Sequence, residues 1–168
     1  MFGLSFERVI PNRARHRLNL VAVLLSDNQI ALDLDLRHRQ SLFEAAAGML
    51  AGECGLPRSA VLESLIARER LGSTALGLGV ALPHARVPGL KQPLAAYVRP
   101  EEPLLFDAPD DKPVGDFLVL LVPDKANQHH LDILAQAAEM FSDPDFRTNL
   151  REAASVAQVR AAFEQWRP

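Results

Sequence analysis

Six apolar residues in a row, Phe117-Leu-Val-Leu-Leu-Val122, precede Pro123 and Asp124. A short continuous apolar run of this kind predicts a β-strand that is buried on both faces and ends at the proline. Such a strand needs a layer of other elements on each side. The run therefore predicts a central sheet covered by helices.

Periodic patterns on either side of this run predict further strands and helices. Residues 30–36 alternate apolar and acidic side chains, which is typical of a half-buried strand, and residues 94–98 also favour a strand. Apolar residues at helical spacing predict five helices, which begin at or near residues 41, 59, 130, 144 and 155. Strands mixed with helices along the whole chain predict an α/β fold, with a central mixed β-sheet flanked by helices.

Helix ends carry capping signals. Ser41 and Glu44 have the spacing of a capping box, and Asp143 followed by Pro144 supplies an N-cap with proline in the first helical position. In the helix over 130–141, the predicted apolar face holds Leu131, Leu134, Ala138 and Phe141.

Composition limits the class of protein. The chain has 168 residues, which favours a single domain, and 48% hydrophobic with 23% charged residues fits an ordinary globular protein. A net charge of -3 gives no general attraction to nucleic acid or an anionic membrane. Cys54 is the single cysteine, so neither an internal disulfide nor a zinc site built on a cysteine pair can form.

The first residues form a basic segment. Residues 1–17 contain four arginines and one glutamate, and we expect them to be an N-terminal extension before a domain over 18–168. No apolar run approaches the roughly 20 residues that span a bilayer, and residues 26–29 offer no small-residue cleavage site. We therefore expect a cytoplasmic protein without membrane insertion.

The segment from 68 to 86 gathers the residue types that an anion site needs. Arg68 supplies a permanent, forked cationic donor. Ser73 and Thr74 supply hydroxyl donors, and the glycines between them and His84 can expose backbone N–H groups. His84 is a titratable nitrogen nucleophile. Together these residues indicate an anion pocket beside a histidine.

The same residues also fit a purely structural interpretation. Arg68 could end a helix in solvent, Ser73 and Thr74 could form an ordinary turn, and His84 could be a structural histidine. Residue types alone leave both interpretations open.

Several ordered motifs resemble the fructose, mannitol and nitrogen class of enzyme IIA domains of the bacterial phosphotransferase system. They are Arg68-Glu-Arg-Leu-Gly-Ser-Thr74, Gly79-Val-Ala-Leu-Pro-His84, Phe106-Asp107-Ala-Pro, Leu120-Leu-Val-Pro123 and His130-Leu131. The resemblance runs from about Ile30 to Trp166. It implies a single enzyme IIA domain that acts as a phosphocarrier.

The resemblance also implies roles by position. His84 corresponds to the phosphoryl acceptor, which holds phosphate on the ring nitrogen farther from the backbone. His130 corresponds to the second active-site histidine, Arg68 to the arginine that helps neutralise the phosphoryl charge, and Ser73 and Thr74 to the hydroxyl pair near the pocket. No metal or cofactor is implied. The nitrogen that attacks must be unprotonated, so a neighbouring acceptor should fix the tautomer, and the sequence does not identify that acceptor.

Three further positions bear on the predicted site. Leu78 stands where the class often has asparagine or glutamate, which raises a question about the tuning of His84. His129 is predicted on the surface because neighbouring helical residues differ in direction by about 100°. Asp107 fits either a turn or a place at the pocket.

The nitrogen branch of the class fits this chain best, because no membrane span or cysteine-bearing domain accompanies the motifs. Members of that branch take phosphate from a histidine phosphocarrier protein and regulate targets such as potassium transporters and sensor kinases. Three alternatives stay open: a sugar-branch enzyme IIA that passes phosphate to a IIB domain, an interaction module that is not phosphorylated, and a metal-dependent hydrolase that uses His84, His130 and Asp107.

Overall fold

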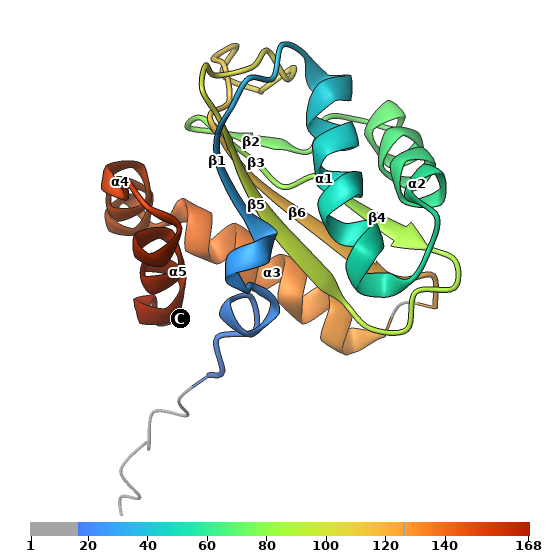
Figure 1. Cartoon of the computed structure of the whole chain (residues 1–168). Helices are drawn as coiled ribbons and strands as arrows, with labels where there is room; N and C mark the ends of the chain where they lie inside the picture. The colour runs from blue at the N-terminus through green and yellow to red at the C-terminus, as the bar shows by residue number, and fades with distance from the viewer. Residues whose placement is uncertain (1–16, 126) are drawn as a thin grey trace, which may run out of the picture.

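The computed structural model describes residues 17–125 and 127–168. Six strands form one sheet: β1 (Ile30–Leu34), β2 (Ala75–Gly77), β3 (Val80–Ala81), β4 (His84–Val87), β5 (Leu94–Pro100) and β6 (Asp116–Pro123). The strand order is β1-β5-β6-β3-β2, and β4 also pairs with β6 (Figure 1). Because β5 is antiparallel to β6 while β1, β3 and β4 make parallel pairs, the sheet is mixed, as predicted.

Five α-helices cover this sheet. They are α1 (Arg39–Cys54), α2 (Arg58–Arg70), α3 (Gln128–Ser142), α4 (Pro144–Glu152) and α5 (Val156–Gln165), and two short 3-10 turns, η1 (Ala22–Leu24) and η2 (Asp27–Gln29), precede β1. Helices α1 and α2 lie over one face, and α3 crosses the other (Figure 1). The α/β prediction is confirmed.

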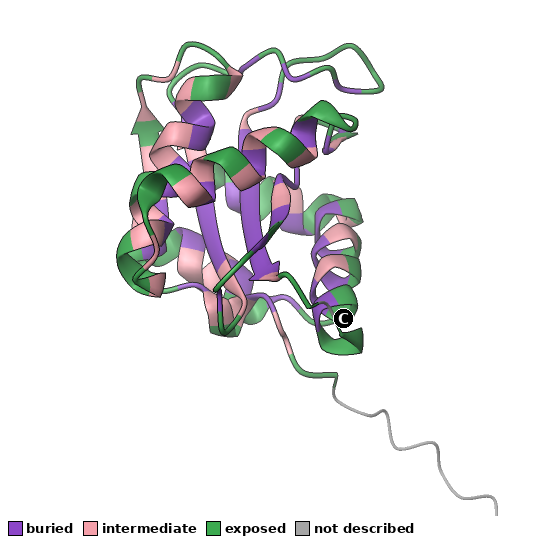
Figure 2. Ribbon diagram, turned by 90° about the vertical axis from the view of Figure 1, so that its right-hand side faces the viewer, coloured by how far each residue is buried: buried purple, intermediate pink, exposed green. Residues whose placement is uncertain are grey.

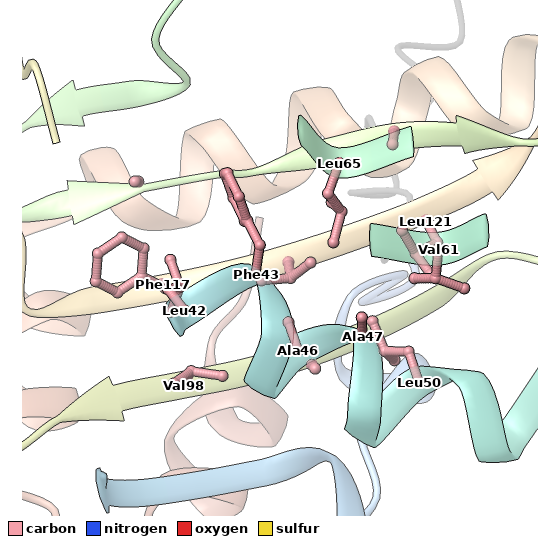
Figure 3. Packing of buried hydrophobic residues seen from close by; sticks show 14 of the residues in the cluster. Leu42, Phe43, Ala46, Ala47, Leu50, Val61, Leu65, Val98, Phe117 and Leu121 are labelled. Carbon is pink, nitrogen blue, oxygen red and sulfur yellow. The ribbon is translucent and has the colours of Figure 1, made fainter. Parts of the chain in front are cut away.

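Strand β6 is the centre of the molecule, and its side chains alternate between two apolar clusters. Phe117, Val119 and Leu121 pack with α1 and α2 in the cluster drawn in Figure 3. Leu118 and Leu120 pack with α3 on the opposite face. Figure 2 shows the central strands almost wholly buried. The apolar run therefore forms the doubly buried strand that its composition predicts.

The start of α1 differs from the prediction. His38, not Ser41, is the N-cap residue, and its ring Nδ1 accepts a hydrogen bond from the backbone N–H of Ser41 at 3.2 Å. Ser41 lies at the third helical position, where its hydroxyl donates to the His38 carbonyl at 2.6 Å. The N-cap therefore lies three residues earlier than predicted, because a histidine ring supplies the capping acceptor.

The apolar face of α3 also differs from the prediction. Leu131 is 52% exposed, whereas His130, Ile133, Ala137 and Met140 are buried. Phe141 is buried, and Leu134 and Ala138 pack against the same cluster, as predicted, so the error is confined to the first turn, where His130 is buried in place of Leu131. The predicted start of α4 is confirmed, since Asp143 Oδ1 accepts from the N–H of Asp145 at 2.9 Å and Pro144 is the first helical residue.

Most of the predicted basic extension, residues 1–16, lies outside the described residues. Arg17, its last member, pairs with Glu139 of α3 at 3.3 Å. In the part of the chain that the structure describes, no helix combines the length and the apolar character needed to cross a membrane.

Candidate functional site

The pairing of β4 with β6 sets the direction of His84. His84 opens β4 and lies level with Leu120, whose N–H donates to the Pro83 carbonyl at 2.9 Å. Ala85 and Val87 pack into the cluster under α1 and α2. Because side chains alternate along a strand, the half-buried His84 points to the opposite face, where α3 lies.

His130 reaches the same layer from α3. It is 6% exposed, and Ile133, one turn later, packs in the cluster that contains Leu120. Since Leu120 is the β6 neighbour of His84, both imidazoles lie on the α3 side of the sheet. The next ring along, His129, is exposed, as the helical rotation predicts.

A main-chain acceptor fixes the ring of His84. Its Nδ1 lies 2.8 Å from the carbonyl oxygen of Leu82. A carbonyl can only accept, so Nδ1 carries the proton and Nε2, the nitrogen farther from the backbone, keeps its lone pair. The acceptor that the sequence could not identify is therefore the backbone of Leu82.

The surroundings of His84 keep this ring neutral. Burial lowers the pKa of His84 below its ordinary value, and the positive charge of Arg68 lowers it further. The hydrogen bond to Leu82 and the negative charge of Glu69 act in the opposite direction without cancelling the shift. The net shift in pKa favours the neutral form of the His84 ring.

The ring of His130 is fixed by the cap of α3. The side chain of Asn127 accepts from the backbone N–H of His130 at 3.2 Å, and the N–H of Asn127 donates to His130 Nδ1 at 3.3 Å. Nδ1 therefore acts as an acceptor, and in the neutral ring the proton lies on Nε2. In their neutral forms, Nε2 of His130 therefore carries a proton and Nε2 of His84 carries a lone pair.

Arg68 carries a charge that acts on His84 and lies at the end of α2, before the segment that leads to β2. In that segment the Thr74 carbonyl accepts from the Leu82 N–H at 3.0 Å. Arg68 Nη1 donates to the Gly72 carbonyl at 3.0 Å. Among the described residues, no carboxylate lies within ion-pair distance of Arg68, so its charge is free to act on an anion.

The hydroxyls of Ser73 and Thr74 are engaged within the fold. Ser73 Oγ donates to the Phe106 carbonyl at 2.7 Å, and Thr74 Oγ1 donates to Glu69 Oε2 at 2.7 Å. The N–H of Thr74 donates to the other oxygen of Glu69 at 3.0 Å. Both residues shape the turn beside His84 in this arrangement. Their predicted role as phosphate donors stays a prediction, and it requires an exchange of these bonds.

Glu69 is a buried residue of the same motif that was not among the predicted site residues. It is 6% exposed and lies in the last turn of α2. Val61, Leu65 and Glu69 are four residues apart and share the buried face of the helix. A carboxylate in line with two apolar residues was the signal that could have identified it.

Leu78 lies away from His84. Leu78 is 56% exposed at the tip of the β2–β3 hairpin, where its N–H donates to Asp110 at 2.9 Å and its carbonyl accepts from Arg151. Val80 and His84 pair with residues four apart on β6, so the tip is at least about 13 Å from His84 along the sheet. A polar side chain at this tip would not contact the His84 ring.

Asp107 directly precedes the turn that the Asp111 N–H closes on the Ala108 carbonyl at 3.0 Å, so its predicted turn role is not confirmed. Its φ of 50° lies in the left-handed region, and its carboxylate pairs with Arg39 at 2.5 Å. Within residues 17–125 and 127–168, no three His, Cys, Asp or Glu side chains group closely enough to hold a metal ion. His84, His130 and Asp107 therefore do not form the ligand set that the hydrolase alternative needs.

Comparisons with known proteins point to one family. The model of the family described as "Phosphoenolpyruvate-dependent sugar phosphotransferase system, EIIA 2" matches residues 23–166. The chain is 41% identical over 118 residues to the Nitrogen regulatory protein of Pseudomonas aeruginosa, which covers 68% of this chain and 75% of that one. It is 36% identical over 103 residues to the fructose-specific EIIA component of Haloferax volcanii. That match covers 61% of this chain and 67% of the relative.

A solved structure has the same fold. The crystal structure of Nitrogen Regulatory Protein IIA-Ntr from Neisseria meningitidis superposes with a TM-score of 0.82 at 43% identity, and it covers 86% of this chain and 99% of that chain.

Proposed function

We propose that this chain, which belongs to the EIIA 2 family of the phosphoenolpyruvate-dependent sugar phosphotransferase system, carries a phosphoryl group on Nε2 of His84. The observation that carries the proposal is the hydrogen bond from His84 Nδ1 to Leu82, because it leaves the lone pair of Nε2 free to attack. Membership of the family makes the chain a component of the phosphotransferase system.

The transfer needs positioning and charge stabilisation more than proton movement. Nε2 of His84 bonds to phosphorus as the bond from phosphorus to the donor nitrogen breaks, and the broken bond's electron pair stays with the donor ring. Negative charge spreads over the equatorial oxygens in this step. Arg68 offsets that charge, and the Nε2–H of His130 is oriented to donate to one of these oxygens.

The donor we propose is a histidine phosphocarrier protein, and the branch is the nitrogen-related one. Support comes from the names of the relatives from Pseudomonas and Neisseria. The phosphorylation state of His84 would then regulate targets such as potassium transporters or sensor kinases, since a phosphoryl group adds nearly two negative charges. Such a relay operates in the cytoplasm.

The test is phosphorylation in a reconstituted relay. The chain is incubated with phosphoenolpyruvate, enzyme I and the small phosphocarrier, and its intact mass is measured. We expect a gain of one phosphoryl group in the wild type and in His129→Ala, whose exposed histidine lies beside the site. We expect no gain in His84→Ala. An unmodified wild type in the presence of charged phosphocarrier would overturn the proposal in favour of a binding module.

A sugar-branch function is the second candidate. It is favoured by the similarity to the fructose-specific EIIA component of Haloferax volcanii. Transfer from phosphorylated wild type to a purified IIB protein separates the two branches. Rapid transfer would favour the sugar branch, and phosphate retained on His84 would favour the nitrogen branch.

A further inference from the structure

Glu69 is a buried carboxylate that no cation neutralises. It is 6% exposed, and among residues 17–125 and 127–168 no lysine or arginine lies within ion-pair distance of it. Its two oxygens instead accept the N–H and the hydroxyl of Thr74, at 3.0 and 2.7 Å. A buried charge that only neutral donors satisfy is costly for folding, so its presence beside His84 suggests a functional role.

A continuous chain of hydrogen bonds joins Glu69 to the nucleophile. The carboxylate accepts from Thr74, the Thr74 carbonyl accepts from the Leu82 N–H at 3.0 Å, and the Leu82 carbonyl accepts from His84 Nδ1 at 2.8 Å. At Thr74 and at Leu82 the N–H and the C=O belong to different peptide groups, so the links fix the relative positions of these residues and do not act by mutual polarisation. The position of Glu69 therefore helps to set both the location and the orientation of the His84 ring.

Charges of opposite sign flank this ring. Arg68 and Glu69 are consecutive residues at the end of α2, and both act on the charge state of His84. Arg68 attracts a phosphoryl group on Nε2, whereas the carboxylate of Glu69 repels it. Without Glu69, Arg68 would lower the free energy of the phosphorylated state further, and the release of the phosphoryl group would be slower.

We propose that Glu69 is a positioning residue that also keeps the phosphoryl group on His84 transferable. The inference rests on the proposed function. In the transfer step the phosphorus–nitrogen bond of the donor breaks, the bond to Nε2 forms, and Nδ1 keeps its proton on the Leu82 carbonyl. The product carries more negative charge than the free ring, and the fixed carboxylate opposes this gain.

The decisive variant is Glu69→Gln, because the amide keeps the shape of the side chain. Its oxygen can accept from the Thr74 N–H and its NH₂ can donate to the Thr74 hydroxyl, so the charge is lost and the hydroxyl hydrogen bond reverses direction. We expect the equilibrium with the charged phosphocarrier to shift toward phosphorylated His84 by about three- to tenfold. Glu63→Gln is the matched control, because Glu63 lies on the exposed side of the same helix.

A second readout separates charge from structure. The pKa of His84, followed by NMR of the ring protons, should fall in Glu69→Gln, since a charge that raises it has been removed. It should not move in Glu63→Gln. An unchanged phosphoryl equilibrium in a folded Glu69→Gln variant would overturn the inference.

Glu69→Asp tests positioning and keeps the experiment informative if the glutamine variant does not fold. The shorter side chain retains the charge but draws it back from Thr74. We expect slower transfer with an equilibrium close to that of the wild type, and a wild-type rate would contradict the positioning role. Failure of the proposed function is distinct, because the wild type itself would then stay unphosphorylated beside a charged donor.

Discussion

The two ends of the site hold their histidines in opposite ways. At the start of β4, His84 Nδ1 donates to the carbonyl of Leu82. At the start of α3, His130 Nδ1 accepts from the N–H of Asn127. The two histidine side chains are therefore fixed in different tautomers, although both lie on the same side of the sheet. One ring presents a lone pair at Nε2, and the other presents a proton there.

This contrast shows that the backbone group beside each ring, and not the residue type, sets which tautomer the ring adopts. The segment between β3 and β4 supplies the carbonyl of Leu82, and the start of α3 supplies the N–H of Asn127. The carbonyl leaves a lone pair on Nε2 of His84, whereas the N–H leaves the proton of the neutral His130 ring on Nε2. Substitutions that act on one ring at a time can test this contrast.

Removal of the donor ring should have the largest effect. In His130→Ala, Nε2 of His84 is still free to attack, but the hydrogen bond to the equatorial oxygens is lost. We expect the phosphorylation rate to fall by about 10²-fold, a typical effect of removing one preorganised donor. Rapid-quench measurement with charged phosphocarrier gives this rate.

The control for this prediction is His130→Gln, whose amide can donate in place of the ring. Partial recovery of the rate is expected. If His130→Ala were phosphorylated as fast as the wild type, the His130 ring would not assist the transfer to His84, and His130 would be only a capping residue.

The fold was largely predictable from the sequence, and the site only in part. The run over 117–122 specifies a strand with cover on both faces, because apolar side chains must all be removed from water. The direction in which a helix faces is less well specified. Leu131 fits an apolar face as well as Ile133 does, and packing against the sheet decides between them.

The chemistry of the site escaped prediction where it depends on the main chain. Every residue has a carbonyl, so nothing in the identity of Leu82 marks it as the partner of His84. Ser73 and Thr74 were recognised as donors, but residue type does not specify the acceptor. Glu69 was visible in principle through its spacing from Leu65, and only its burial shows that the spacing matters.

A substitution in the N-cap of α3 should have an effect of intermediate size. Asn127→Ala removes the acceptor for the His130 N–H and should lower the free energy of unfolding by about 1 kcal/mol. It should also slow phosphorylation several-fold, because the ring of His130 is less firmly oriented. Chemical denaturation and the transfer assay measure the two effects separately.

Ser155→Ala is the matched control for the cap. Ser155 caps α5, where its hydroxyl accepts from the N–H of Gln158 at 3.2 Å. The loss of stability should be similar, with no change in phosphorylation rate. If both cap variants slowed phosphorylation equally, stability rather than ring orientation would be the cause.

The smallest effect concerns pH, and it distinguishes the nucleophile directly. The pKa of His84 is lowered, chiefly by burial, so the attacking nitrogen should stay unprotonated at pH values somewhat below the ordinary 6.5. The phosphorylation rate should fall with acidification only below that pH. An inflection at or above 6.5, for a donor whose own titration is known, would contradict the buried neutral ring.

The same shift has a consequence for folding, and its sign is fixed. The unfolded chain binds a proton at His84 at a higher pH than the folded chain does. Stability is therefore complete above the unfolded pKa and declines as pH falls from about 6.5 toward the lowered folded value. His84→Gln should flatten this part of the stability profile, measured by denaturation across that range, while the Asn127 and Ser155 variants should only displace it. A slope that survives in His84→Gln would assign the acid sensitivity to another group.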